Sequence, residues 1–300
     1  MIALPSPHCG ACVVEMLSGW AVPVVSSTRC IAGSVAVAVA LVASAAVAQA
    51  QATAAISAGN ANSACKLSAI AAGKVATVVD GRSFVLDDGR EVRLAAIEVA
   101  APTEPAGTAA KDALAALIAE QTVELRGAGP QTDRYGRLSA HAFVGTDKAE
   151  RWVEAELVAG GHARVSGRVG ERACAAALLA RERAARAANL GLWADPYYVV
   201  RRADDAAAVA AERGRFAIVE GKVLSVRESG GTIYVNFGRR WSQDFTVTIA
   251  KKNETTFTNA GLEPKKLAGR RVRIRGWIER RGGPWVEATR PEQIELAERN

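Results

Sequence analysis

The chain has 300 residues, of which 49% are hydrophobic and 23% are charged, and its mean hydropathy is +0.05. This balance excludes a mostly disordered chain and a protein with many membrane spans, and the length predicts two modest domains or one domain with appendages. The formal charge is +7, and residues 214–300 account for all of it with 17 Lys and Arg against 10 Asp and Glu. The C-terminal part is therefore the surface that we expect to meet a polyanion.

The first 50 residues predict a signal peptide. An uncharged apolar run covers residues 31–47, with Arg29 before it and the small-residue sequence A-Q-A at 48–50 after it. This order is typical of cleavage after about residue 50, so we expect a periplasmic or secreted protein with no stable membrane insertion after cleavage. An uncleaved membrane anchor is the alternative. Residues 51–72, rich in Ala, Ser, Asn and Gly, are expected to form a flexible lead-in.

Two of the five cysteines follow the predicted cleavage site. Cys9, Cys12 and Cys30 would leave with the signal peptide, whereas Cys65 and Cys174 would remain. Two cysteines in an exported protein predict one disulfide. Two separate buried thiols are the alternative.

Residues 73–196 predict a curled β-sheet with helices packed on it. Alternating apolar residues indicate strands, and Asp-Gly sequences mark the turns between the first three. Apolar residues at helical spacing indicate three helices. The fold class is therefore mainly β with α, an OB-like barrel with packed helices. The expected strands are residues 74–79, 83–86, 91–97, 122–125 and 138–144, and the expected helices are 105–119, 152–158 and 171–189.

Three motifs in this segment resemble those of the staphylococcal nuclease, or thermonuclease, family. They are VVDGRSFVLDDGREVRLAAIEVAAP at residues 78–102, T-D-R-Y-G-R at 132–137 and L-G-L-W at 190–193, in the order that the family has them. The resemblance covers about residues 73–196. It implies the OB-fold barrel of that family and hydrolysis of DNA or RNA phosphodiesters, usually with Ca²⁺.

The resemblance implies a substrate site around two arginines. Arg93 and Arg137 fall on the family positions that hold the phosphate and stabilise charge in the transition state. Arg134 and Tyr135 fall in the same motif as Arg137 and are expected to contact the substrate. For each of the two arginines the alternative is a structural ion pair, for example between Arg137 and Asp133.

The metal and acid positions differ from the family pattern. Asp80 keeps the first carboxylate of its turn, but Arg82 stands at one metal-ligand position, Glu98 at the other and Ala101 at that of the catalytic glutamate. We expect the Arg82 guanidinium to replace the ion and to pair with Glu98, so no cofactor is expected. Ca²⁺ would require a rebuilt site with Glu98 and Asp80 as ligands. In that case Glu98 and Glu104 would be the catalytic acids.

Residues 214–300 predict a second small OB-like β-barrel after a linker at 197–213. Basic clusters with interleaved aromatic residues suit single-stranded DNA or RNA, because cations follow the backbone and rings stack on bases. Another polyanion, such as an acidic envelope surface, is an alternative partner. In the remaining alternative, the rings form the core and the arginines only solvate the outside. The expected strands are residues 217–227, 232–237, 245–249, 271–279 and 285–288, and the candidate binding residues are Arg239, Arg240, Trp241, Arg273 and Arg275.

Two functions remain open from the sequence. The first is an exported nuclease with an altered metal requirement. The second is a non-catalytic protein that binds nucleic acid or another polyanion, or that supports an envelope partner. Arg82 and Ala101 are the residues that distinguish them, because they remove a metal ligand and a general base.

Overall fold

The computed structural model describes residues 65–127, 132–146 and 149–297. The predicted signal peptide, its three cysteines and most of the predicted lead-in lie outside these residues. Each strand residue has a fixed partner on the neighbouring strand. The strand pairing therefore determines where the side chains of the candidate site lie.

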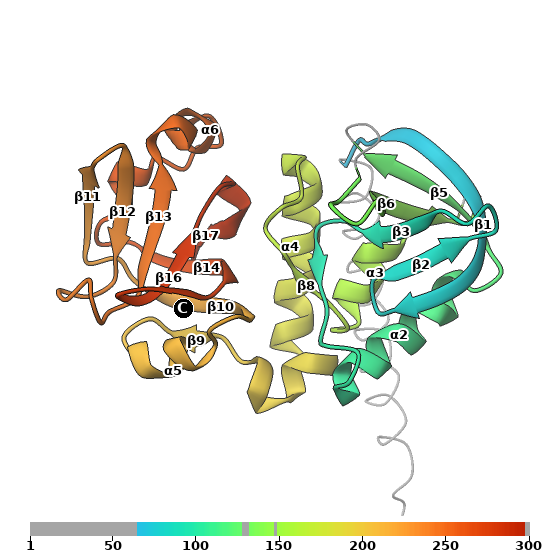
Figure 1. Ribbon diagram of the computed structural model, residues 1–300, viewed down its shortest axis with the longest axis horizontal. Helices are drawn as coiled ribbons and strands as arrows, with labels where there is room; N and C mark the ends of the chain where they lie inside the picture. The colour runs from blue at the N-terminus through green and yellow to red at the C-terminus, as the bar shows by residue number, and fades with distance from the viewer. Residues whose placement is uncertain (1–64, 128–131, 147–148, 298–300) are drawn as a thin grey trace, which may run out of the picture. The chain divides into compact units, whose positions relative to one another are not determined.

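Five strands close into a first barrel (Figure 1). The pairs β1–β2, β2–β3, β1–β5 and β5–β6 are antiparallel, and a parallel pair, β3–β6, closes the ring. This confirms the predicted OB-like barrel. The strands are β1 (Ser68–Asp80), β2 (Ser83–Leu86), β3 (Glu91–Leu94), β5 (Thr122–Gly127) and β6 (Leu138–Val144), with β7 (Arg151–Trp152) beside β6 and a separate pair, β4 (Ile97–Glu98) with β8 (Arg164–Val165).

Three helices pack on this barrel: α2 (Pro105–Ile118), α3 (Val153–Ala159) and α4 (Arg172–Ala187). Pro105 opens α2, where its fixed φ suits the first turn and its missing N–H is not needed. The helices bury their apolar faces against the strands, with Leu114 and Leu178 fully covered. The predicted disulfide is present, and it joins Cys65, just before β1, to Cys174 on α4.

The first strand is longer than the sequence predicted. Residues 68–72 belong to β1, and Ser68 pairs opposite Gly127 at the far end of β5. The prediction of a flexible lead-in is therefore wrong for residues 68–72. The Ala- and Ser-rich composition suggested a linker, but a β-strand gains its stability from hydrogen bonds to a neighbour that is remote in sequence.

A second strand group, residues 216–296, has its own hydrophobic core. One sheet has the order β11-β12-β13-β16-β15 and the other β17-β14-β10-β9. The pair β13–β16 is parallel, and the pairs β10–β14, β11–β12, β12–β13, β14–β17 and β15–β16 are antiparallel. The strands are β10 (Phe216–Lys222), β11 (Ser225–Ser229), β12 (Thr232–Asn236), β13 (Thr246–Ala250), β14 (Arg271–Trp277), β15 (Glu279–Arg281), β16 (Gly283–Glu287) and β17 (Ile294–Leu296), with α6 (Glu254–Asn259) after β13.

Two predicted segments of this region differ in the structure. The strand expected at 217–227 is divided between β10 and β11, because the chain turns from one sheet to the other at Val223 and Leu224, which bond to different strands. The linker expected at 197–213 holds β9 (Arg201–Arg202), which pairs in parallel with β10, and α5 (Ala206–Ala211). The proposed division into separate domains stays a prediction.

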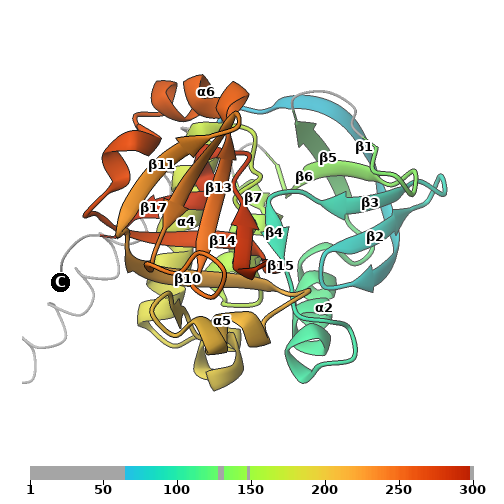
Figure 2. The ribbon, with the colours of Figure 1, turned by 60° about the vertical axis from the view of Figure 1, so that its left-hand side comes forward.

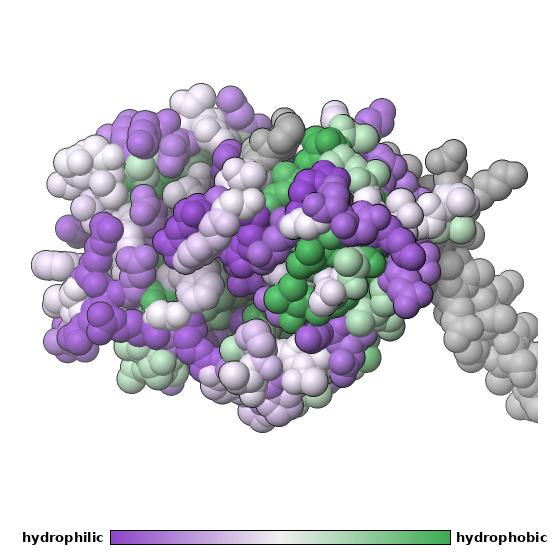
Figure 3. Space-filling model, turned by 45° about the vertical axis from the view of Figure 1, so that its right-hand side comes forward, coloured by the Kyte–Doolittle hydropathy of each residue, from purple (hydrophilic) through white to green (hydrophobic). Residues whose placement is uncertain are grey.

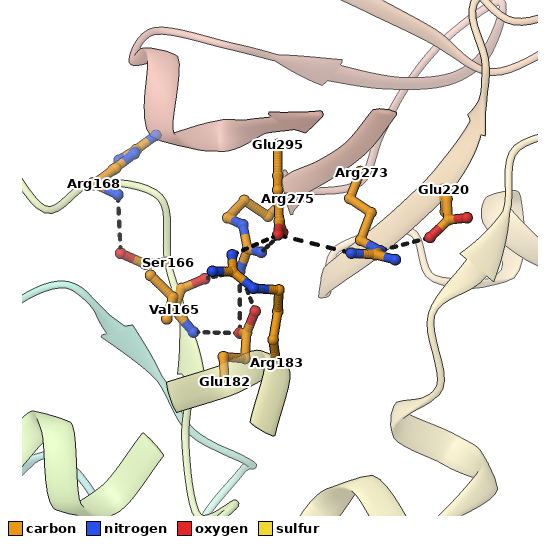
Figure 4. A network of polar contacts seen from close by, with 9 residues as sticks. All are labelled: Val165, Ser166, Arg168, Glu182, Arg183, Glu220, Arg273, Arg275 and Glu295. Carbon is orange, nitrogen blue, oxygen red and sulfur yellow. Dashed lines mark hydrogen bonds and ion pairs between the residues drawn. The ribbon is translucent and has the colours of Figure 1, made fainter. Parts of the chain in front are cut away.

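The second strand group packs against the first barrel through apolar and ionic contacts. A small core joins Ala100, Trp193 and Phe216. Figure 4 shows Arg275 of β14 reaching Glu182 of α4 and the β8 carbonyl of Val165. On the face drawn in Figure 3, hydrophilic and hydrophobic residues are interleaved and neither kind covers it. In the part of the chain that the structure describes, no helix is both long and apolar enough to cross a membrane.

Candidate functional site

The turn between β1 and β2 directs Arg82 toward the segment that follows β3. Asp80 Oδ1 accepts a hydrogen bond of 2.8 Å from the Arg82 backbone N, a local bond that fixes the turn. Leu94 N donates to Arg82 O at 2.8 Å, which ties the turn to the end of β3. Arg82 Nη1 then donates to the Glu98 carboxylate and lies 3.4 Å from Ile97 O. The structure therefore brings Arg82 and Glu98 into direct contact.

The donor set around Glu98 does not fit a calcium ion. Ca²⁺ takes six to eight oxygen ligands. Here the Glu98 carboxylate is paired with the Arg82 guanidinium, and the Asp80 carboxylate accepts a hydrogen bond from the backbone of its own turn. Side chains of Arg82 and Glu98 are only 16% and 14% exposed, so water screens their attraction weakly. Among the described residues, one group of potential ligands is close enough to share an ion, and two of its members form the disulfide: Cys65, Glu171 and Cys174.

Arg93 is the unpaired cation of this site. It lies on β3 opposite Ser83 of β2, and its side chain forms no hydrogen bond or ion pair with another residue that the structure describes. Burial lowers the pKa of Arg93, and the positive charges of Arg82 and Arg137 lower it further, while Glu98 acts in the opposite direction. A partly buried guanidinium without a counter-ion favours the approach of an anion.

Arg137, in contrast, has a carboxylate partner. Its Nη2 donates to Asp133 Oδ2 at 2.7 Å, and the hydrogen bonds from Arg137 lower the pKa of Asp133. The other Asp133 oxygen accepts from the backbone N of Tyr135, and Gly136 turns the loop with φ +80°. The Tyr135 ring is 66% exposed, with the Arg134 guanidinium 4.8 Å and that of Arg137 5.1 Å from its centre. The loop therefore presents an aromatic face between two cations.

The structure does not bring Glu104 to this site. Glu104 precedes α2, where its carboxylate accepts a hydrogen bond from the Tyr198 hydroxyl and lies 3.6 Å from Arg215. Burial and the Glu104 carboxylate raise the pKa of Tyr198. Glu104 is not among the charges that shift Arg93. It therefore joins the start of α2 to the segment that connects the first barrel to the second strand group.

The candidate residues of the second strand group divide by exposure. Arg273 is half-buried and donates to Glu220 at 2.6 Å. Arg275 is 0% exposed and is held by Glu182, so the prediction that it contacts a ligand is wrong. A guanidinium that is already desolvated and paired inside the protein has no surface for a nucleic acid. The exposed members of the predicted set are Arg239, Arg240 and Trp241.

Three further exposed residues lie near Trp241 and were not chosen as candidate binding residues: Arg227, Tyr234 and Arg281, of which Tyr234 and Arg281 belong to the basic and aromatic clusters of the sequence. Arg227 and Tyr234 lie directly opposite each other on β11 and β12. The alternation of polar and apolar residues along these strands was the signal that could have found them, because it places both on the face away from the core.

Comparisons with known proteins match the first barrel from β3 onward, together with its helices. The model of the family described as staphylococcal nuclease homologue matches residues 90–195. Protein ParB of Escherichia coli is 33% identical over an alignment of 135 residues that covers 42% of this chain and 75% of the relative. The chain belongs to the staphylococcal nuclease homologue family. Membership in this nuclease family suggests a nuclease-like function and nucleic-acid binding. The family match includes Arg93, Glu98 and Arg137, whereas Arg82 precedes it.

Proposed function

We propose that this protein is an exported member of the staphylococcal nuclease homologue family that binds nucleic-acid phosphodiesters at Arg93 without calcium-dependent hydrolysis. The observation that carries this proposal is the hydrogen bond from Arg82 to Glu98 beside the unpaired Arg93. A cation that is part of the protein neutralises the carboxylate that a metal would need. The anion-binding part of the site is left unchanged.

A phosphate suits the charges around Arg93. Arg82 is paired with Glu98 and Arg137 with Asp133, whereas Arg93 forms no ion pair and is favoured only by the more distant charges of Glu98 and Asp80. A phosphate accepts hydrogen bonds from the parallel N–H groups of a guanidinium. These bonds offset the hydration that the guanidinium loses on burial. The exposed Tyr135 ring provides a surface on which a neighbouring base can stack.

The acids that hydrolysis would need are engaged elsewhere. Glu98 accepts a hydrogen bond from Arg82, and Glu104 accepts one from Tyr198. A general base must lie within hydrogen-bond reach of the attacking water and carry a free lone pair toward it. Ala101, at the position of the family's catalytic glutamate, supplies no side-chain oxygen. The arrangement therefore supports binding more than cleavage.

Export is part of the proposal. It is supported by the disulfide between Cys65 and Cys174, since disulfides persist in oxidising compartments such as the periplasm. The apolar run at 31–47 with small residues after it supports the same conclusion. In such a compartment the proposed partner is single-stranded DNA or RNA.

The test measures binding and cleavage together. Fluorescently labelled single-stranded DNA and RNA are titrated with the purified protein in EDTA and in Ca²⁺, and the products are separated on a gel. Arg93→Ala is expected to weaken binding about tenfold or more, because a hydrogen bond to a charged group is worth about 1.5–3 kcal/mol. Arg90→Ala is the matched control, since Arg90 lies in the same barrel but is paired with Asp88.

Two results would contradict this proposal. Equal binding by Arg93→Ala and Arg90→Ala would remove Arg93 from the site. Cleavage that requires Ca²⁺ and disappears in Arg93→Ala would show a working metal site despite Arg82. Arg93→Lys guards against a folding defect: it keeps the charge but loses the guanidinium fork, so it should bind with intermediate affinity.

A further inference from the structure

A groove of about 790 Å³ lies on the second strand group, over β11, β12 and β13, which come to the front in Figure 2. Strand alternation creates its floor. Ile233 and Val235 of β12 are buried in the core, whereas Tyr234 between them lines the groove. In the strand register Tyr234 stands between Arg227 of β11 and Thr248 of β13. The groove is therefore a regular feature of the sheet face.

The charge of the groove is positive and uncompensated. Arg227, Arg239 and Arg281 line it, and no Asp or Glu does. Within the described chain Arg227 and Arg239 form no ion pair or hydrogen bond through their side chains, and Arg281 lies 3.7 Å over the centre of the Trp285 ring. By contrast, all three arginines of β14 bond to carboxylates of the protein itself. At the groove, Arg227 and Arg239 therefore carry positive charges that no carboxylate of the described chain balances.

Aromatic rings accompany these cations. Trp241 is 70% exposed and Tyr234 is 37% exposed, while Trp285 is buried and its indole N–H has no partner. Buried indole donors usually find an acceptor, and a Trp left in water exposes a large apolar face. The exposed rings suit a ligand that offers flat rings.

We propose that this groove binds single-stranded nucleic acid, with bases stacked on Trp241 and Tyr234 and phosphates on Arg227, Arg239 and Arg281. A polyanion without bases would use the arginines and leave the exposed rings without a role. A neutral sugar would use the rings and leave three unpaired cations in place. A single strand uses both kinds of side chain, because its bases and phosphates alternate along the chain.

The position of the groove supports the same ligand. β12 and β13 follow β10 and β11 in this group, and Trp241 lies on the connection between them. Arg281 ends β15, where the chain turns into β16. OB folds, the class predicted for this region, bind oligonucleotides on one sheet face and on the loops beside it. The site goes beyond the proposed function, since Arg93 lies in the first barrel.

The test uses a fluorescent oligothymidylate of about ten nucleotides, within the length that one OB fold covers. Titrations with the full protein in EDTA are run for Trp241→Ala and for Trp277→Ala. Trp277 is the matched control, because it is 47% exposed in the same strand group but does not line the groove. Trp241→Ala is expected to weaken binding about tenfold, since each 1.4 kcal/mol of stacking is a factor of ten. Trp277→Ala should leave binding unchanged.

The salt dependence provides a second readout. Arg239→Ala should reduce the slope of log affinity against log salt concentration by about 0.7, the value for one phosphate contact on a single strand. Arg270→Ala, an exposed arginine outside the groove, should not change that slope. Both Trp variants are repeated in Arg93→Ala. A loss caused by Trp241→Ala in that background belongs to the groove and not to the first barrel.

Two outcomes would overturn the proposal. The first is equal oligothymidylate binding by Trp241→Ala, Trp277→Ala and the unchanged protein. The second is that heparin displaces all of the bound oligothymidylate while Trp241→Ala changes the affinity for neither heparin nor the oligothymidylate. This result would indicate a site for polyanions that does not recognise bases.

Discussion

Replacing Arg275 by Met perturbs the contact between the second strand group and α4. Arg275 is 0% exposed, its Nη1 donates to Glu182 at 2.8 Å and to Val165 O at 3.1 Å, and its Nη2 donates to Glu295 at 3.1 Å (Figure 4). Met fills a similar volume but carries no charge and no donor. Glu182, itself 0% exposed, then keeps the Val165 N–H at 2.8 Å as a partner and loses its counter-ion.

The expected loss is about 3–5 kcal/mol in the free energy of unfolding, because removing one partner leaves an uncompensated charge in the interior. Whole proteins are stable by about 5–15 kcal/mol, so this is a large fraction of the total. For a chain of this size the midpoint of thermal unfolding should fall by roughly 6–20 °C.

Urea unfolding followed by tryptophan fluorescence measures this loss. Adding Glu182→Gln to Arg275→Met removes the buried charge but keeps an oxygen for the Val165 N–H, so most of the loss should be recovered. Arg271→Met is the control, because Arg271 lies on the same strand with its side chain 54% exposed and should cost at most about 1 kcal/mol. A loss below about 1 kcal/mol for Arg275→Met, or no recovery in the double variant, would refute the reasoning.

Two further predictions concern stability. Cys65→Ser opens a disulfide that spans 109 residues and should lower the free energy of unfolding by up to about 4.7 kcal/mol in urea; a change below about 1 kcal/mol would contradict it. Burial lowers the pKa of His162, so the unfolded chain binds a proton at higher pH than the folded one. Stability should therefore fall as the pH drops below about 6.5, and His162→Gln should flatten this decline; an unchanged slope would argue against it.

Local signals predicted much of the fold. Asp80 and Gly81 mark the turn after β1, and Asp88 with Gly89 marks the turn after β2, as the structure has them. These residues work locally, because they stabilise tight turns whatever the rest of the chain does. Glu171 caps α4 by accepting from Cys174 N, which is again a contact between near neighbours.

Exposure was predicted less well than secondary structure. Arg273 and Arg275 alternate with Val272 and Ile274 along β14, so the sequence places both arginines on the face away from the core. Arg273 stays half-buried, but Arg275 is covered by α4 of the first barrel. A period of two assigns residues to the faces of a strand and contains no information about what packs on either face.

The sequence by itself predicted the barrel, the disulfide between the two cysteines left after the predicted cleavage, and the pairing of the opposed charges of Arg82 and Glu98. Only the tertiary structure decided which cations are free. Arg275 finds Glu182 at a separation of 93 residues, whereas Arg93 and Arg227 find no carboxylate among the described residues. Neutralisation of a charge depends on distances of a few ångströms in space, and the order of residues along the chain does not specify these.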